Sequence, residues 1–215
     1  MRLPYKNEER KLFKEKYKYI VAVDEVGMGC LAGPVVVCAV LITKNFLDKR
    51  NKKLYWLRDS KQLLPRQREN YFKILTNDKN FIWTVSYCYP KTIDKINIYQ
   101  AARKAMRRAI KKLLNRLKPD SKTIVLVDGK NKIKGLNLEQ KAIVKGDRRV
   151  FSIACASLVA KVTRDKMMIR YGKKFQDYGF EKHKGYGTKG HQIQLNKFGP
   201  SKIHRKSFAP VAKLI

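Results

Sequence analysis

Acidic residues are scarce in this sequence. Seventeen Asp and Glu stand against 50 Lys and Arg, so the 215-residue chain has a formal net charge of +33. A chain this basic repels itself unless a polyanion or salt screens the charge. Nucleic acid is therefore the first partner that the composition indicates, ahead of an anionic membrane and an acidic protein. Because the acids are so few, the positions that they occupy are informative.

Long apolar segments are absent as well. The longest run free of charged or strongly polar side chains covers residues 30–42 and contains Gly33-Pro34. A transmembrane helix needs about 20 apolar residues, so this run is too short to span a bilayer. Residues 1–19 are charged throughout and contain no apolar signal core, and we therefore expect a cytoplasmic protein without a membrane partner.

Cysteine is also sparse, and no two cysteines have the spacing of a zinc-binding pair. This excludes a disulfide framework or a zinc site built from cysteine pairs. The sequence around most of them is apolar, so we expect small buried hydrophobic residues in a reducing compartment. The four positions are Cys30, Cys38, Cys88 and Cys155.

The hydrophobic pattern predicts an α/β fold. Apolar, β-branched segments predict strands at 19–23, 35–42, 81–89, 123–127 and 150–153, with the first two paired as a hairpin. Helical periodicity predicts helices at 65–75, 97–117 and 154–171, with Asn97 as an N-cap, and a shorter helix from the Thr188 cap to Gly199. Residues 1–18 are expected to form a mobile basic lead-in or a short helix. This order favours a mixed central β-sheet flanked by helices, with a helical C-terminal appendage.

Acids are concentrated at the ends of the predicted strands. Asp24 and Glu25 follow the first strand, Asp128 follows the fourth, and Asp147 precedes the fifth. Sites in open α/β sheets lie beyond the carboxyl ends of the strands, so these side chains could converge. Converging carboxylates repel one another unless a cation such as Mg²⁺ or Mn²⁺ lies between them, and two such ions suit phosphodiester hydrolysis. The alternative is that strand-end acids only cap turns.

Eight short segments, in order along the chain, resemble the ribonuclease HII family of type 2 ribonucleases H. Each alone is a weak signal, but their common order leaves little room for chance. The segments are Asp24-Glu-Val-Gly27 with Gly29 and Leu31-Ala-Gly-Pro-Val35, Asp59-Ser-Lys61, Ala105-Met-Arg-Arg-Ala109, Val127-Asp-Gly129, Val144-Lys-Gly-Asp147, Ala156-Ser157 through Ala160-Lys-Val-Thr-Arg-Asp165, His183-Lys-Gly-Tyr-Gly-Thr188, and His204-Arg-Lys-Ser-Phe208.

The resemblance implies a ribonuclease H-like fold and cleavage of RNA in RNA–DNA hybrids. It also implies incision 5′ to single ribonucleotides embedded in duplex DNA, which leaves 3′-hydroxyl and 5′-phosphate ends. By resemblance, the catalytic metal ligands for two Mg²⁺ or Mn²⁺ ions are Asp24, Glu25, Asp128 and Asp147. Three regions are expected: a lead-in at 1–18, a catalytic domain at 19–178, and a C-terminal segment at 179–215 that contributes to nucleic-acid binding.

Substrate contacts follow from the same resemblance. Gly27 and Gly29 let the backbone approach the minor groove, where 2′-hydroxyls are exposed. Tyr186 is expected to stack on the sugar at the RNA–DNA junction, although it could instead be a packed loop aromatic. Basic positions near phosphates are expected at Lys61, Lys161 and Arg164.

Met28 departs from the family pattern, because ribonuclease HII usually has an arginine between the two glycines. If the family contact is made by main-chain groups, Met28 preserves it; if an arginine head group holds a phosphate, that contact is lost. Junction specificity is therefore less determined than the nuclease class. The alternatives are a hybrid-specific enzyme with weak junction discrimination, and a nonenzymatic basic nucleic-acid-binding protein, which would have no use for the retained acids.

Four further residues have plainer interpretations. We expect Asp165 to form a structural ion pair with an arginine or to lie on a helix surface, rather than to bind metal. No two histidines have metal-ligand spacing, so they are expected to be loop or phosphate-facing groups: His183, His191 and His204. A monomer is the default expectation for the oligomeric state.

Overall fold

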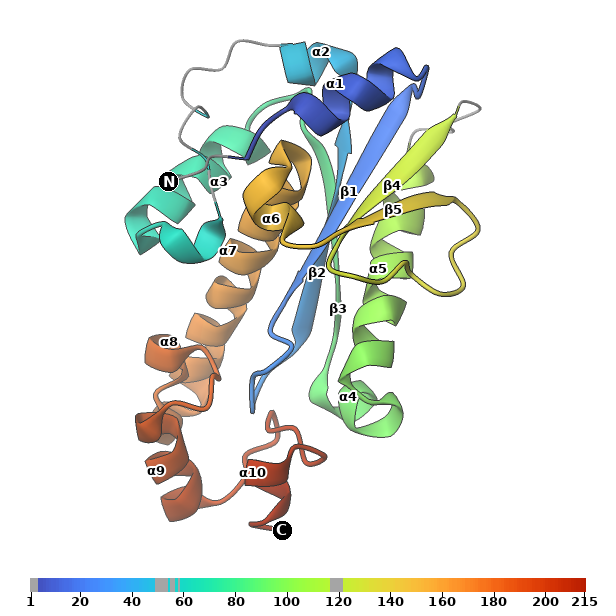
Figure 1. Ribbon diagram of the computed structural model, residues 1–215. Helices are drawn as coiled ribbons and strands as arrows, with labels where there is room; N and C mark the ends of the chain where they lie inside the picture. The colour runs from blue at the N-terminus through green and yellow to red at the C-terminus, as the bar shows by residue number, and fades with distance from the viewer. Residues whose placement is uncertain (1–3, 49–53, 55–56, 58, 117–121) are drawn as a thin grey trace.

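A mixed five-stranded sheet forms the centre of the molecule (Figure 1). The computed structural model describes residues 4–48, 54, 57, 59–116 and 122–215. The strands lie in the order β3-β2-β1-β4-β5. Their bounds are β1 Tyr19–Val26, β2 Val35–Ile42, β3 Ile82–Cys88, β4 Thr123–Asp128 and β5 Glu139–Ile143.

Strand direction changes at β1, in the middle of the sheet. β1 pairs antiparallel with β2 and parallel with β4. β3 extends the antiparallel side and β5 the parallel side. The expected hairpin and mixed sheet are therefore confirmed, and the carboxyl ends of β1 and β4 lie side by side.

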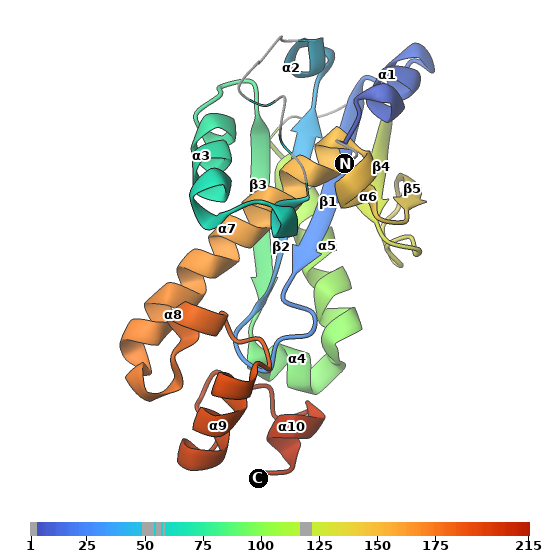
Figure 2. The same cartoon turned by 60° about the vertical axis from the view of Figure 1, so that its left-hand side comes forward.

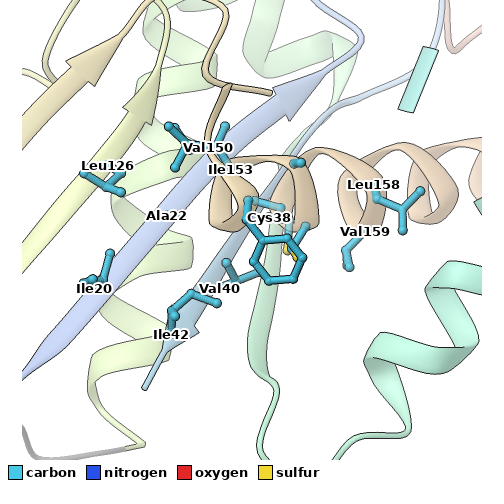
Figure 3. Packing of buried hydrophobic residues seen from close by; sticks show 14 of the residues in the cluster. Ile20, Ala22, Cys38, Val40, Ile42, Leu126, Val150, Ile153, Leu158 and Val159 are labelled. Carbon is cyan, nitrogen blue, oxygen red and sulfur yellow. The ribbon is translucent and has the colours of Figure 1, made fainter. Parts of the chain in front are cut away.

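Helices cover both faces of the sheet. α7 (Phe151–Lys174) and α3 (Pro65–Thr76) lie on one face, and α5 (Ile98–Leu114) lies on the other (Figure 2). Since both faces are buried, β1 and β2 have nearly continuous apolar sequences with alternate residues facing opposite cores. Figure 3 shows the α7 side of this packing, where strand residues meet helix residues: Ile20, Ala22, Cys38, Val40, Ile42, Leu126, Val150, Ile153, Leu158 and Val159. All four cysteines are buried with free thiols, as expected.

The predicted strand at 150–153 is wrong. Val150 makes only an isolated bridge to Tyr5, and Phe151 already begins α7. The fifth strand is instead β5, which the sequence analysis missed. The predicted helix at 97–117 is confirmed as α5 with Asn97 as its cap, since the Asn97 side chain accepts a hydrogen bond from the Gln100 amide. Residue 117 lies outside the described residues. A separate short helix, α4 (Pro90–Ile96), precedes that cap.

The N-terminal lead-in forms a short helix packed on the core. α1 (Asn7–Lys14) buries Leu12 in the same cluster as α7. Buried Glu9 accepts a hydrogen bond of 2.7 Å from the Ser152 amide in the first turn of α7. Of the two expectations for residues 1–18, the short helix is the one that the structure shows for the described part. α2 (Lys44–Asp48) lies near α1 (Figure 1).

The C-terminal appendage is helical, as expected, and returns to the end of the β1–β2 hairpin. It contains the short helices η3 (Gln176–Tyr178) and α8 (Phe180–His183), then α9 (Lys189–Phe198) and α10 (Ala209–Ala212). The Thr188 side chain caps α9 by accepting from the His191 amide. Two isolated bridges, Cys30 to Tyr186 and Ala32 to His204, join the appendage to the loop between β1 and β2.

No helix in the described ranges has both the length and the apolar character required to cross a membrane.

Candidate active site

A cleft of about 560 Å³ opens at the carboxyl ends of β1 and β4. It collects residues from the central strands, the loop after β1, α3, α7 and the C-terminal appendage. Most of the residues singled out in the sequence line it. The lining residues are Asp24, Glu25, Val26, Gly27, Met28, Gly29, Ser60, Lys61, Arg68, Asp128, Ser157, Lys161 and Tyr186.

Asp24 and Glu25 lie at the carboxyl end of β1, on opposite faces of the sheet because strand side chains alternate. Asp24 is 5% exposed, and its Oδ1 accepts a hydrogen bond of 2.8 Å from the Glu25 amide. Glu25 is partly buried. Among the described residues, its Oε2 finds no hydrogen-bond partner, although that atom is buried. An unpartnered carboxylate oxygen in a buried position is costly unless a cation or water satisfies it.

Asp128 and Asp147 reach the same region from β4 and from the short helix α6 (Gly146–Arg149). The Gly146 amide donates a hydrogen bond of 2.6 Å to Asp128 Oδ1, which ties the two segments together. A side chain at Gly146 would place its Cβ 3.2 Å from Asp128 Oδ1 and 2.5 Å from Ile153 Cδ1. Glycine is therefore required for this close approach. Asp147 lies next to it and is 6% exposed.

The carboxylates resist ionisation together. Burial raises the pKa of Asp24 well above its usual value, and the neighbouring Glu25 and Asp128 carboxylates raise it further. The pKa of Glu25 rises to about 7, first through burial and then through Asp128. Burial and the Asp128 carboxylate also raise the pKa of Asp147. The site thus concentrates negative charge that its surroundings do not compensate.

This donor set fits a hard divalent cation. All four groups are carboxylates, and oxygen ligands suit Mg²⁺ and Mn²⁺. A cation would also satisfy the buried Glu25 Oε2, which has no hydrogen-bond partner among the described residues. In the described part of the chain, no three His, Cys, Asp or Glu side chains are already arranged as the ligands of one ion. Lys61 lies nearby, with its Nζ 3.8 Å from Asp147 Oδ2.

The loop after β1 forms one wall of the cleft. Gly27 has a φ of +94°, which an L side chain rarely adopts, and a Cβ there would lie 2.4 Å from Arg164 Nε. Gly29 is exposed and has open space around its α-carbon. Met28 lies between them and packs against the apolar cluster on the α5 face. Its side chain therefore contacts apolar neighbours.

Tyr186 lines the cleft beside this loop, to which its bridge with Cys30 joins it, and is 36% exposed. Lys161 Nζ lies 5.5 Å and Arg164 Cζ 5.6 Å from the centre of its ring. Burial raises the pKa of the Tyr186 hydroxyl to about 12, so the ring stays neutral. Lys161 also forms an ion pair of 2.8 Å with Asp165. Asp165 is thus a structural partner on the surface of α7, although its partner is a lysine.

Arg164 differs from the expectation of an exposed basic residue near phosphates. It is fully buried and lies behind the wall of the cleft. Its guanidinium donates three hydrogen bonds, and all three go to backbone carbonyls. The acceptors are Pro34 O at 2.9 Å, Lys184 O at 2.9 Å and Ala32 O at 3.1 Å. The reason is that the appendage folds over this part of α7.

His204 lies in a loop, which is one of the two alternatives expected for the histidines, whereas His191 lies in α9. Both are buried, and their Nε2 atoms lie 3.0 Å apart. His191 Nδ1 donates to the Tyr186 carbonyl at 2.9 Å, while His204 Nδ1 accepts from Ser201. His183 is the last residue of α8, before the Tyr186 loop, and stacks on His191 with ring centres 4.2 Å apart.

Sequence reasoning did not assign a role to three cleft residues. Ser60 and Ser157 lie with their hydroxyl oxygens 3.2 Å apart. Both stand in segments that carry the family resemblance, which was the available signal. Arg68 from α3 holds the Ser60 carbonyl at 3.0 Å, and no sequence pattern marked it.

The chain matches the ribonuclease HII family over residues 21–211. It is 46% identical over 200 residues to a ribonuclease HII of Caldicellulosiruptor saccharolyticus, covering 93% of this chain and 91% of the relative. The ribonuclease H2 of Pyrococcus horikoshii superposes with a TM-score of 0.70 at 25% identity, covering 91% of this chain and 96% of that one. A Bst ribonuclease HIII superposes with a TM-score of 0.68 at 15% identity, covering 91% and 68% of the two chains.

These likenesses cover the sheet, the cleft and most of the C-terminal appendage. The fold is ribonuclease H-like. The chain therefore belongs to the ribonuclease HII family and is a ribonuclease H, a nuclease that hydrolyses phosphodiester bonds.

Proposed function

We propose that this protein is a divalent-metal-dependent endoribonuclease that cuts RNA in RNA–DNA hybrids and incises 5′ to ribonucleotides embedded in duplex DNA. The bond that breaks joins phosphorus to the 3′ oxygen of the preceding nucleotide. Water supplies the new oxygen on phosphorus, so the products carry a 3′-hydroxyl and a 5′-phosphate. The observation that carries the proposal is the group of four acids from β1, β4 and α6 in a basic molecule.

The residues that would hold two Mg²⁺ or Mn²⁺ ions are Asp24, Glu25, Asp128 and Asp147. The buried orphan oxygen of Glu25 and the mutually raised pKa values support this role. Bound ions would supply an activated water and neutralise charge on the leaving oxygen. The crystal structure of the Bst ribonuclease HIII is described in complex with Mn²⁺, which agrees with this choice.

The walls of the cleft suit a nucleic-acid duplex. The main chain at Gly29 is exposed and open enough for a sugar to approach, and Gly27 and Tyr186 line the same cleft. Lys61 and Lys161 also line the cleft and would bring positive charge to passing phosphates. We assign ribose recognition to the backbone of the 27–29 loop, stacking to Tyr186 and phosphate contacts to the two lysines.

The C-terminal segment would contribute to binding through Tyr186 and the loop that carries it. We propose that the protein acts as a monomer. A hybrid-specific enzyme with weak junction discrimination is the second candidate, because Met28 packs on apolar neighbours and offers no cation to a phosphate.

The test compares Asp128→Asn with wild type on labelled duplex DNA that carries one ribonucleotide, with and without Mg²⁺. Asparagine keeps an oxygen that can accept from the Gly146 amide, so the fold should persist while one ligand charge is lost. We expect activity to fall by orders of magnitude while duplex binding is retained. Asp177→Asn, which changes an exposed acid on η3, is the matched control and should remain active. Near-wild-type turnover of Asp128→Asn in saturating Mg²⁺ would remove Asp128 from the proposed ligand set.

A further inference from the structure

Two buried arginines lie directly beneath the loop that we assign to ribose recognition. Arg164 and Arg205 are both 0% exposed. In the described ranges, neither forms an ion pair with a carboxylate. Burying an unpaired guanidinium costs several kcal/mol, and hydrogen bonds to carbonyl oxygens offset only part of that cost. Such an arrangement calls for a functional reason beyond stability.

Arg205 binds the 27–29 loop through its backbone. Its Nη2 donates to the Gly27 carbonyl at 2.6 Å, its Nη1 to the Met28 carbonyl at 2.9 Å, and its Nε to the Gly33 carbonyl at 3.1 Å. One planar guanidinium therefore holds two consecutive peptide groups of the 27–29 loop and the Gly33 carbonyl, which lies just before β2. A lysine ammonium cannot reproduce this fork, because it is a single point of charge.

These contacts determine which way the loop amides face. In a trans peptide the carbonyl and the following N–H point in opposite directions. Since the Gly27 and Met28 carbonyls point at Arg205, the amides of Met28 and Gly29 point away from it. Arg205 is buried and all three loop residues line the cleft, so these amides face the cleft. Among the described residues, no group accepts a hydrogen bond from either amide.

We propose that Arg205 is a positioning residue for ribonucleotide specificity: it fixes the peptide orientation of the 27–29 loop, so that the Met28 and Gly29 amides donate to the oxygen of a ribose 2′-hydroxyl. The proposal rests on the proposed function for the identity of the substrate. The loop geometry itself does not depend on that function.

Further contacts fix the position of Arg205 relative to the connection between β1 and β2. The Arg205 amide donates to the Leu31 carbonyl at 2.8 Å, and Ala32 forms a bridge with His204. Arg164 supports the opposite side of the loop through the Ala32 and Pro34 carbonyls. Burial lowers the pKa of Arg205 to about 10, which leaves it protonated at neutral pH. The C-terminal segment thus brings a permanent cation to the back of the loop.

The experiment uses Arg205→Met and Arg205→Lys in the full chain, with Leu113→Ala as a stability control. Leu113 is buried near the end of α5, away from the loop, so its truncation weakens the core without touching residues 27–29. Binding is measured in the Asp128→Asn background, which prevents turnover. The readout is the ratio of dissociation constants for an all-DNA duplex and for the same duplex with one ribonucleotide. A second readout is the amide resonances of Met28 and Gly29, or a crystal structure of the variant.

We expect Arg205→Met to reduce the ratio by at least about tenfold, the effect of one lost hydrogen bond to the sugar, and to shift both amide resonances. Arg205→Lys should give an intermediate loss, because it keeps the charge and one donor. Leu113→Ala should lower the melting temperature and leave the ratio unchanged. A folded Arg205→Met protein with both the ratio and the resonances unaltered would overturn the proposal.

The two proposals fail in different ways. If the wild-type chain binds both duplexes equally, the assignment of ribose recognition to this loop is wrong, and the specificity role of Arg205 is wrong with it. If wild type discriminates and Arg205→Met discriminates equally, the proposed function stands and the role of Arg205 is overturned. If Arg205→Met does not fold, Arg205→Lys supplies the same two readouts.

Discussion

Met28 is the residue at which this chain leaves the usual pattern of ribonuclease HII, where an arginine stands between the two glycines. Its side chain packs on the α5-side core, and its carbonyl is held by Arg205. We expect Met28→Arg to increase the affinity for a ribonucleotide-containing duplex by up to about tenfold, if the new cation regains about 1.4 kcal/mol. The cut site should stay the same, because backbone and carboxylates set it.

The matched control is Met28→Gln, which has a similar length and no charge. It should bind as wild type does in equilibrium titrations with labelled duplex. Met28→Arg would contradict this in either of two ways: by moving the cut site, or by being the only form that incises at a single ribonucleotide. Either result would show that ribonucleotide recognition depends on an arginine side chain at position 28 and not on the loop backbone.

Tyr186 offers a second test at the scale of one residue. Its ring faces the cleft with Lys161 and Arg164 near its faces. Phenylalanine keeps a stacking surface and alanine does not, and stacking on a base or sugar is worth about 1–3 kcal/mol. We expect Tyr186→Phe to be much milder than Tyr186→Ala in steady-state kinetics. The alanine variant should lose more on a single embedded ribonucleotide than on a long hybrid. Equal losses on both substrates would indicate general support of the cleft.

The sequence revealed the carboxylates but not the arginines behind the loop. Acidic residues are few in this basic chain, and Asp24 and Asp128 each follow an apolar run of a strand. Their positions in the sequence were therefore enough to identify them as candidates. Arg164 and Arg205 are two of 50 basic residues, and nothing local distinguishes a buried guanidinium from an exposed one. Their burial results from the C-terminal segment folding back on the hairpin, which is a long-range contact.

At the scale of elements, the fold could be predicted except where burial erased the periodicity. Residues 151–160 are buried on every side, so the start of α7 has no polar face and its apolar run resembles a strand. β5 shows the converse problem. It is a sheet edge with mostly exposed or half-buried side chains, and its sequence Glu139–Ile143 contains no apolar run.

The contacts that connect α9 and the His204 loop to the Tyr186 loop should depend on pH. His191 and His204 form a buried chain in which His204 Nε2 donates to His191 Nε2, and His191 Nδ1 donates to the Tyr186 carbonyl. This chain requires both rings to be neutral. Burial lowers the pKa of each histidine to about 4. Positive charge on His183 would lower both pKa values further, and positive charge on His191 would lower that of His204.

The sign follows from linkage. The unfolded chain binds a proton at each histidine near pH 6.5, whereas the folded chain does not until about pH 4. The stabilisation is complete above about pH 6.5 and is lost as the pH falls toward 4. For each histidine the loss between about pH 7 and about pH 5 is on the order of 2 kcal/mol. The cleft carboxylates with raised pKa values act in the opposite direction.

His204→Gln separates these contributions, because glutamine can still donate to His191 and does not titrate. We expect a shallower fall in the free energy of unfolding between pH 7 and pH 5 for His204→Gln than for wild type, measured by urea denaturation with EDTA present. The same dependence of the unfolding free energy on pH in both proteins would contradict this. It would show that His204 is already charged in the folded state, or that the His191–His204 contacts break before the molecule unfolds.

At the scale of the whole molecule, the charge of +33 coexists with a cleft that concentrates carboxylates. A duplex bound over the cleft would bring its phosphates against the cations that line it, Lys61, Arg68 and Lys161. Lys61 reaches the cleft with a side chain that is 71% exposed, whereas Lys111 lies exposed on α5 on the opposite face of the sheet. The two lysines provide a matched pair for locating the binding face.

Binding to duplex should weaken steeply with salt, with a slope of log affinity against log salt of roughly −0.9 for each phosphate neutralised. We expect Lys61→Gln to make that slope shallower by about one phosphate contact, and Lys111→Gln to leave it as in wild type. Fluorescence titrations with a non-cleavable duplex at several salt concentrations measure both slopes. A wild-type slope near zero would place the excess charge away from the bound duplex. Equal reductions by both lysines would mean that the duplex extends around to the α5 face.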